Sequence, residues 1–302
     1  IEADQWAQTQ SVDRDSILPF ALETHRRFCE QLPSDLLALK DGSSMIPGKF
    51  RMREVQVGRH VAPKADKLDR FLDRFATAYG GYLGKAKLGG IHKLEAILAT
   101  FVAHHRFVWI HPFPDGNGRV SRILLDAMLR ECGVNQASLW SMSRGFAKTA
   151  EEYKSMLAEA DQPRMGDLDG RGNLSEKALI VFCDYAMKTA IDQTKFMAQM
   201  FALDKFKSRA EHFFRTVRFD LKPESFYLYL QAFTNGEFER MEAGRITGLP
   251  ERTARNVLNQ LIQEGFLVSD TPKGKVRVGF PVHALGSLLP NLYPAGDVDF
   301  VR

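Results

Sequence analysis

The twelve residues from His111 to Arg122 constrain this chain more than any other feature. They read His-Pro-Phe-Pro-Asp-Gly-Asn-Gly-Arg-Val-Ser-Arg and lie between two stretches with helical spacing of apolar residues. Gly116 and Gly118 supply backbone freedom, and Asn117 can cap the helix that follows. Successive N–H groups in such a turn can converge on an anion, and the N-terminus of a helix adds to that attraction. The segment therefore predicts a phosphate-binding loop.

The side chains of this segment add chemistry to the loop. Arg119 and Arg122 are three residues apart, so they are neighbours on one helical face, and each can form paired hydrogen bonds to phosphate oxygens. Asp115 offers a carboxylate for Mg²⁺ bound to phosphates. His111 ionises near neutral pH, which suits a general base for a hydroxyl group. A plain helix connection does not explain these four residues together, and a calcium loop needs further acidic positions that are absent from the sequence.

Residues 111–122 resemble the signature of the Fic family, His-x-Phe-x-(Asp/Glu)-Gly-Asn-Gly-Arg-x-x-Arg, and match all eight of its specified positions. Most members of that family move AMP from ATP to a hydroxyl side chain of a target protein. The resemblance implies that His111 is the general base, that Asp115 binds Mg²⁺ and that Phe113 anchors the loop. It also implies a group of residues that bind ATP: Gly116, Asn117, Gly118, Arg119, Val120, Ser121, Arg122 and Tyr153.

Turn residues around a short alternating run between residues 48 and 63 predict a loop or small hairpin. This stretch looks like the part of Fic proteins that leads into a flap, where a target segment pairs with the enzyme as an added strand. The residues expected to dock the target are Val57, Gly58, Arg59, His60 and Val61. A surface hairpin without a partner is the alternative.

The start of the chain, Ile1-Glu2-Ala3, resembles the end of the inhibitory motif of Fic proteins, whose Glu pairs with the second signature arginine. This resemblance predicts a regulatory ion pair between Glu2 and Arg122, and an unrelated Glu at the chain end is the alternative. Because the chain does not open with Met, we expect its natural N-terminus to lie further upstream.

Residues 219–288 differ in character from those before them. Three predicted helices precede two short strands joined by Thr271-Pro-Lys-Gly274, a pattern that resembles a winged helix-turn-helix module. From Asp220 to Leu285 there are eight basic and eight acidic residues, so this module has no net charge. Five basic residues nevertheless fall on the presumed recognition helix and wing: Arg252, Arg255, Lys273, Lys275 and Arg277. That distribution suits DNA, whereas docking of a protein and homodimer formation are the alternatives.

The chain of 302 residues is long enough for two domains. We expect a mainly α fold: an N-terminal helical segment at 1–40, a helical Fic-type catalytic domain with a small β-hairpin flap at 41–218, a winged-helix (α+β) domain at 219–288 and a tail at 289–302. Three widely spaced cysteines, no signal peptide and no membrane-spanning run favour the cytoplasm.

The expected activity is transfer of AMP from ATP to a Ser, Thr or Tyr hydroxyl of a target protein, including this chain itself. The expected cofactors are ATP and Mg²⁺, and DNA is a further expected partner. One alternative is a DNA-binding regulator whose Fic-like domain senses nucleotide or is idle. Another is a Fic enzyme that transfers a different group or removes AMP.

Overall fold

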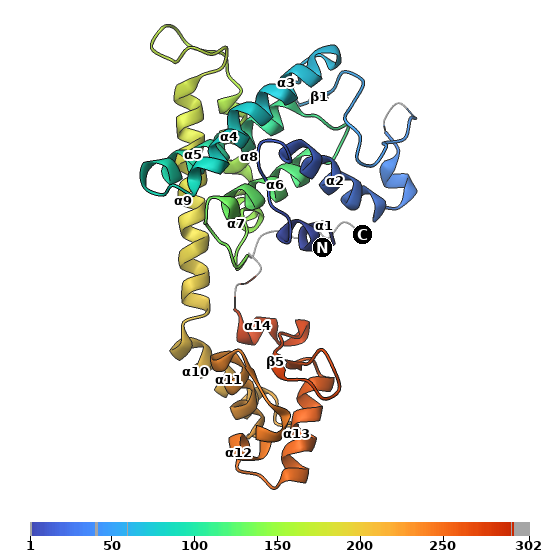
Figure 1. The fold of residues 1–302 in the computed structure, drawn as a ribbon, viewed down its shortest axis with the longest axis vertical. Helices are drawn as coiled ribbons and strands as arrows, with labels where there is room; N and C mark the ends of the chain where they lie inside the picture. Colours follow the sequence, from blue (N-terminus) through green and yellow to red (C-terminus); the bar gives the residue numbers. More distant parts are fainter. Residues whose placement is uncertain (1, 40–41, 59, 291, 293–302) are drawn as a thin grey trace. The chain divides into compact units, whose positions relative to one another are not determined.

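The computed structural model describes residues 2–39, 42–58, 60–290 and 292. The fold is mostly helical with two small antiparallel sheets, as the sequence predicts (Figure 1). The chain forms two compact units, residues 1–194 and residues 195–302. In the described part of the chain, no helix has both the length and the apolarity that crossing a bilayer requires.

The helices of the first unit, with one shared with the second, are α1 (Glu2–Gln8), α2 (Ile17–Glu30), α3 (Leu68–Phe75), α4 (Gly81–Ala86), α5 (Gly90–Ile110), α6 (Asn117–Glu131), α7 (Met142–Lys148), α8 (Ala150–Ala160) and α9 (Glu176–Met200). Shorter turns are η1 (Ser34–Leu37), η2 (Ala65–Lys67) and the π-helical η3 (Ala76–Gly80). The strands β1 (Gln56–Val57) and β2 (His60–Val61) pair antiparallel, so the expected hairpin is present.

Helix α5 lies in the core of the first unit, and most residues of its C-terminal half are buried. Phe101 and Phe107 are fully buried, and α6 and α4 pack against the helix on different sides. The N-terminal segment also belongs to this core, since Ile17 and Phe20 of α2 share a cluster with Phe107 and with Phe113 of the loop. The residues expected to form a separate segment at 1–40 therefore help to hold the 111–122 loop.

The second unit begins with the end of α9 and continues with α10 (Leu203–His212), the π-helical η4 (Phe213–Val217), α11 (Ser225–Asn235), η5 (Arg240–Glu242), α12 (Ala243–Thr247), α13 (Glu251–Gln263), η6 (Val282–Ala284) and α14 (Leu285–Leu288). Its strands are β3 (Glu237–Phe238), β4 (Leu267–Val268) and β5 (Val276–Val278). They form an antiparallel sheet in the order β3-β5-β4. The expected strand–turn–strand pair is β4 and β5, with Leu267 opposite Val278.

Along the sequence, the boundary between the two units falls inside α9, after Thr194, and not between residues 218 and 219, where the sequence predicted it. The physical reason is the apolar face of α10 and η4. Phe206, Phe213 and Phe214 are buried in the same core as Tyr229 of α11 and Phe266 before β4. Residues 203–217 therefore fold with the second unit. Of the predicted tail, residues 291 and 293–302 lie outside the described residues.

Candidate active site

His111 follows the last residue of α5 and has a left-handed backbone, with φ 51° and ψ 62°. Such a conformation is uncommon for a residue other than glycine and costs free energy. The His111 N–H still donates to the carbonyl of Phe107 at 3.0 Å, which completes the last turn of the helix. The chain therefore turns sharply at His111, and the half-buried imidazole stands at the junction of α5 and the loop.

The hydrogen bonds of the His111 ring define its tautomer. Nδ1 lies 3.2 Å from the carbonyl oxygen of Val108, which can only accept, so Nδ1 carries the hydrogen of the neutral ring. The other nitrogen, Nε2, is then unprotonated. Burial lowers the pKa of His111 below its usual 6.5, and the nearby His60 and Arg51 lower it further. A neutral imidazole with a free Nε2 lone pair is the form that a general base requires.

The turn after His111 is closed by one side-chain amide. Asn117 accepts from the N–H of Phe113 through Oδ1 at 2.9 Å and donates to the carbonyl of Phe113 through Nδ2 at 2.8 Å. Gly116 lies between them with φ +81°, and a Cβ at this position would lie 3.3 Å from a ring carbon of Phe28. These bonds hold the loop as a tight turn directly before α6.

A histidine that the sequence analysis did not select supports the loop from α2. The fully buried ring of His25 stacks on Phe113, with centroids 4.0 Å apart. Its Nδ1 accepts from the N–H of Gly48 at 2.9 Å, so Nε2 carries the hydrogen and donates to the carbonyl of Asp115 at 3.2 Å. Burial lowers the pKa of His25 to about 4, so the ring stays neutral. His25 positions the loop and offers no group to a ligand.

Arg51 is a second supporting residue that the sequence analysis did not assign to the site. Its guanidinium is buried and donates from Nε to the carbonyl of His111 at 2.8 Å, with further bonds to Arg53 and Pro63. The N–H of Arg51 also donates to the carbonyl of Pro112 at 2.8 Å. Arg51 thus ties the residue expected to act as base to the segment that carries the hairpin. A lone Arg in a loop gives no sequence signal for this role.

Asp115 and Arg119 are exposed at the mouth of the loop. The Asp115 side chain accepts from the N–H of Gly116 through Oδ1, which leaves Oδ2 for another partner. The guanidinium of Arg119 lies 4.5 Å from the ring centroid of Phe28, which orients it across the helix start. In the described residues, no group of three or more His, Cys, Asp or Glu side chains could hold a metal. One exposed carboxylate beside a phosphate loop fits Mg²⁺ that takes its other ligands from phosphates and water.

Arg122 is half-buried one turn further along α6, beside the hydroxyl group of Tyr153. The Tyr153 hydroxyl also lies 2.9 Å from Nε2 of His104, whose Nδ1 lies 3.2 Å from the carbonyl of Ser121. Tyr153 therefore donates to His104, and its ring stacks on Phe146 with centroids 4.2 Å apart. The structure brings Tyr153 to the arginine side of the loop, while the ring itself is buried.

Two residues of the predicted ATP site turn inward. Val120 is fully buried and belongs to the apolar core of the first unit. The Ser121 hydroxyl is buried and donates to the carbonyl of Gly118 at 3.0 Å. Gly118 itself is close to Arg122, since a Cβ there would lie 3.2 Å from Nη1 of that arginine. Val120 and Ser121 thus support the helix, and their side chains do not face the loop.

The expected flap is a hairpin with two exposed apolar side chains and one anchored residue. Val57 and Val61 are 51% and 67% exposed, so they are available to a partner. The His60 side chain points inward, because Nε2 lies 2.8 Å from the carbonyl of Trp109 and Nδ1 lies 3.3 Å from Oδ2 of Asp161. His60 therefore fastens the flap and does not itself dock a target. Arg59 lies outside the described residues.

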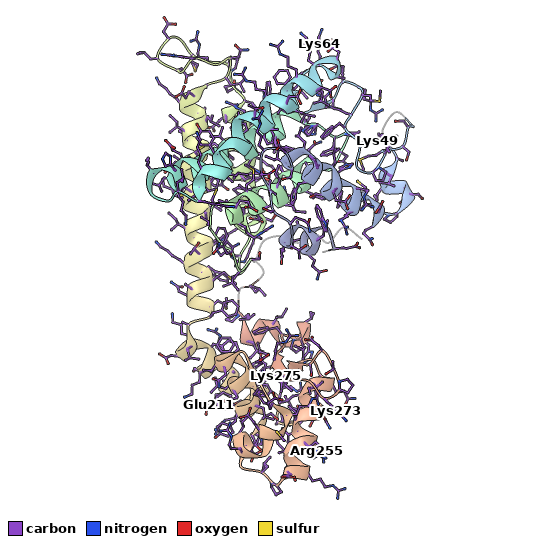
Figure 2. The ribbon with its side chains drawn as sticks, viewed as in Figure 1. Lys49, Lys64, Glu211, Arg255, Lys273 and Lys275 are labelled. Carbon is purple, nitrogen blue, oxygen red and sulfur yellow. The ribbon has the colours of Figure 1, made fainter. Side chains whose placement is uncertain are left out.

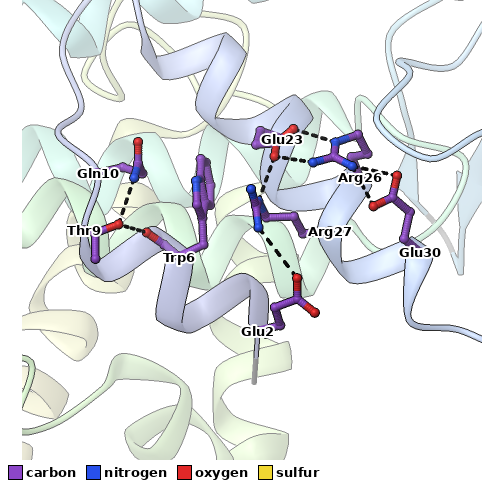
Figure 3. A network of polar contacts seen from close by, with 8 residues as sticks. All are labelled: Glu2, Trp6, Thr9, Gln10, Glu23, Arg26, Arg27 and Glu30. Carbon is purple, nitrogen blue, oxygen red and sulfur yellow. Dashed lines mark hydrogen bonds and ion pairs between the residues drawn. The ribbon is translucent and has the colours of Figure 1, made fainter. Parts of the chain in front are cut away.

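The structure does not bring Glu2 to Arg122. Glu2 forms an ion pair with Arg27 of α2 at 3.6 Å, and the same arginine bonds to Glu23 (Figure 3). The Arg27 guanidinium also covers the ring of Trp6. Helix α1 packs on α2 and α6 through its buried alanines, which turns Glu2 toward α2. The predicted pair of Glu2 and Arg122 is therefore wrong in this structure.

The five basic residues selected in the second unit divide into two groups. Lys275 pairs with Glu237 at 2.6 Å and Arg277 pairs with Asp270 at 2.5 Å, so two of these charges are compensated. Arg252, Arg255 and Lys273 are exposed, and no ion pair joins them to the other described residues. Figure 2 shows Arg255 on α13, with Lys273 and Lys275 at the turn between β4 and β5.

Residues 19–129 match the family model described as Fic/DOC family, so this part of the chain is a Fic/DOC domain. That span contains the flap hairpin and the whole 111–122 loop, but neither Glu2 nor Tyr153. A protein adenylyltransferase Fic of Drosophila erecta is 35% identical over 109 residues, which cover 35% of this chain and 21% of that protein. The Drosophila grimshawi protein of the same name is 36% identical over 109 residues, with the same coverage. The chain therefore spans about a fifth of the length of these relatives.

Two solved structures are also similar to this chain. A Fic domain containing signaling protein from Bacteroides thetaiotaomicron gives a TM-score of 0.42 at 17% identity, over 65% of this chain and 66% of the other. A Fic family protein from Desulfovibrio desulfuricans gives a TM-score of 0.39 at 19% identity, over 92% of this chain and 84% of the other.

Proposed function

Taking the Fic/DOC domain at residues 19–129 as the premise, we propose that this protein transfers AMP from ATP to a Ser, Thr or Tyr hydroxyl of a target protein, including its own. The observation that carries the proposal is the state of His111. Its Nδ1 faces the carbonyl of Val108, so Nε2 of the neutral ring carries no hydrogen, its pKa is lowered, and it directly precedes the loop expected to bind phosphate.

The reaction follows from these positions. His111 Nε2 accepts the proton of the target hydroxyl as its oxygen attacks the α-phosphorus of ATP. The bond from that phosphorus to the bridging oxygen of the β-phosphate breaks, pyrophosphate leaves, and AMP stays on the target oxygen. The protein forms no covalent bond to the nucleotide, so positioning and compensation of charge supply most of the rate.

The loop supplies the charge compensation. Backbone N–H groups at the start of α6 and the guanidinium groups of Arg119 and Arg122 would compensate the negative charge that grows on the leaving pyrophosphate. Because Arg122 is half-buried beside Tyr153, its position is more restricted than that of the exposed Arg119. Asp115 would hold Mg²⁺, which neutralises phosphate charge when bound.

The flap supplies the target's path to His111. The exposed Val57 and Val61 border a short hairpin whose base is fixed by His60 and Arg51. A target segment that pairs with this hairpin would lie next to the carbonyl of Trp109, two residues before the base.

The test is transfer of label from ATP in the presence of Mg²⁺, with the label at the α- or the γ-phosphate. We expect protein-bound α-label that His111→Ala abolishes. The matched control is His92→Ala, because His92 is exposed and pairs only with Glu95 on its own helix. Protein-bound γ-label would identify a kinase-like reaction instead, and absence of both labels would contradict the proposal.

The second unit supports a separate proposal, contact with DNA through a winged-helix arrangement. The specific observation is that Arg252, Arg255 and Lys273 are exposed without an ion pair among the described residues. Binding of a DNA duplex should weaken as salt rises, and Arg252→Glu with Arg255→Glu should remove it. Binding unchanged in that double variant would contradict the proposal.

A further inference from the structure

A groove outside the loop carries an uncompensated positive charge. It has a volume of about 670 Å³ and lies between α3 and α5, with residues 172–174 at one end. Figure 1 shows α3 and α5 beside one another in the first unit, and the two helices are in contact. Four basic side chains line it: Lys67, Arg70, Arg74 and Arg106. None of its lining residues is Asp or Glu, and no ion pair joins these four side chains to a carboxylate within the described part of the chain.

The groove follows from a four-residue repeat in the sequence of α3. The helix reads Leu-Asp-Arg-Phe twice, from Leu68 to Phe75. A period of four is close to one helical turn, so Arg70 and Arg74 form one row and the two Phe residues form another. Asp69 and Asp73 do not line the groove, so these carboxylates do not neutralise the charges of Arg70 and Arg74 within it.

Most of the other residues that line the groove are apolar or aromatic. Phe75 and Ile110 are buried at its base, and the rings of Phe71 and Trp109 meet at 5.6 Å with planes 61° apart. Aliphatic and aromatic side chains of a polypeptide fit such a surface, and the basic side chains around it favour a polypeptide with acidic residues.

The groove is connected to the proposed active site through Trp109. On one side this ring contacts Phe71 of the groove, and on the other it lies 6.1 Å from the ring of His60 in the flap. Ile110, in the groove floor, immediately precedes His111. The groove and the flap therefore share a contact residue, Trp109, two positions before His111.

We propose that the groove docks an acidic segment of the protein that receives AMP, so that the enzyme selects targets by carboxylates near the modified hydroxyl. This inference rests on the proposed function, because it assigns the substrate class of the same site. Arg70 and Arg74 are separated by about 6 Å along the helix, and alternate residues of an extended peptide are separated by about 6.6 Å. The groove therefore matches an extended segment with acidic residues at every second position.

The experiment measures peptide binding without ATP, by fluorescence anisotropy at low salt. The probe is a labelled peptide with Glu at alternate positions, and its partner has Gln at those positions. We expect the Glu peptide to bind the full chain and to lose at least tenfold in affinity in the Arg70→Glu, Arg74→Glu variant. The Arg70→Lys, Arg74→Lys variant retains most of the binding because it keeps the charge. ATP binding and thermal unfolding serve as checks that the fold is intact.

A matched variant separates the groove from overall charge. Lys205→Glu with Lys207→Glu changes the net charge by the same amount on exposed positions of α10, so it should leave peptide binding intact. Equal binding of the Glu and Gln peptides, an unaffected Arg70/Arg74 reversal, or equal loss in the Lys205/Lys207 control would overturn the inference. Tighter binding of a single-stranded oligonucleotide that the Arg70/Arg74 reversal removes would also overturn it. Since no outcome depends on AMP transfer, failure of the proposed function is recognised separately, by the α-label experiment.

Discussion

The imidazole of His25 lies parallel to the ring of Phe113, with an angle of 2° between the planes. The contact joins α2 to the 111–122 loop. The same imidazole bridges Gly48 and Asp115 through its two nitrogens. One neutral side chain therefore connects three segments of the chain: helix α2, the backbone at Gly48 and the loop at Phe113 and Asp115.

Replacing His25 by Phe keeps the stacking and removes both hydrogen bonds. The Gly48 N–H and the Asp115 carbonyl then lose their partner, which costs about 1–3 kcal/mol of stability for each group left buried. Because the loop shifts, we expect kcat for AMP transfer to fall about 10- to 100-fold, while KM for ATP changes less. Steady-state kinetics and thermal unfolding test this, and a wild-type kcat would show that His25 has only a structural role.

The lowered pKa of His111 predicts the pH profile of transfer. The neutral ring is the active form, so the lowered pKa moves the acid limb of the rate profile to a lower pH than an ordinary histidine would give. The rate should decrease only at lower pH, as the ring becomes protonated. In His111→Ala the residual rate should be about 10²- to 10⁴-fold lower and should lack this acid limb. A wild-type profile that falls already above pH 7 would contradict the assignment.

Asn117→Asp keeps the acceptor for the Phe113 N–H but loses the donor to the Phe113 carbonyl. The change also puts a negative charge in a buried position beside the phosphate loop. We expect weaker ATP binding by at least tenfold and a loss of about 1–3 kcal/mol of stability. Asn135→Asp is the matched control, because Asn135 makes similar amide bonds to Leu139 and Trp140 away from the loop. Asn135→Asp should lower stability and leave ATP affinity unchanged. Equal ATP affinities of the Asn117→Asp and Asn135→Asp variants would contradict the prediction.

The Asp161 carboxylate lies between two histidines, with Oδ2 3.3 Å from Nδ1 of His60 in the flap and Oδ1 3.1 Å from Nε2 of His105. Asp161→Ala should release the flap and lower transfer to a protein target about tenfold, with ATP affinity unchanged. Asp184→Ala is a suitable control, since Asp184 is exposed and pairs with Lys188 on its own helix. Transfer assays beside nucleotide titration separate the two effects, and an unaffected target rate would show that the flap is fixed by other contacts.

The buried carboxyl of Asp126 predicts a dependence of stability on pH. Burial raises its pKa from 3.8 to about 7, with Asp4 acting in the same direction and Arg130 and Arg122 opposing it. The folded state keeps this proton to higher pH than the unfolded state, so the stabilisation is present in acid and is lost as pH rises from about 4 to 7. Asp126→Asn keeps an acceptor for the Met142 N–H and removes the buried charge.

The Asn variant should therefore have the higher Tm at pH 8, by roughly 2–4 °C for each kcal/mol gained. The difference should close near pH 5, where wild-type Asp126 is protonated. Calorimetry at the two pH values tests the sign, and a lower Tm of the variant at pH 8 would contradict it.

The sequence predicted the parts of the site whose signal is local. The spacing of residues 111–122 predicted the turn and the start of α6, because glycine, asparagine and helix patterning act over a few residues. The presumed recognition helix with Arg252 and Arg255 is also observed, as α13, since its apolar residues follow one helical face. The flap hairpin and the pairing of β4 with β5 were predicted for the same reason.

The parts that were missed depend on contacts between distant segments. His25 is 90 residues from Asp115, and neither the stacking on Phe113 nor the bond to the Asp115 carbonyl leaves a pattern in α2. Glu2 was assigned to Arg122 by resemblance, whereas the packing of α1 on α2 gives it to Arg27. The boundary near residue 218 was placed by a change in composition, and the buried face of α10 was not visible in that change.

The left-handed backbone of His111 has a consequence for protein engineering. Glycine adopts this conformation without the cost that a Cβ imposes, so His111→Gly should make the fold more stable as it removes the proposed base. A library of variants sorted only for heat resistance would then be enriched in inactive molecules at this position. Comparing that library with one sorted for AMP transfer would identify the positions at which the residue that activity requires lowers the stability of the fold.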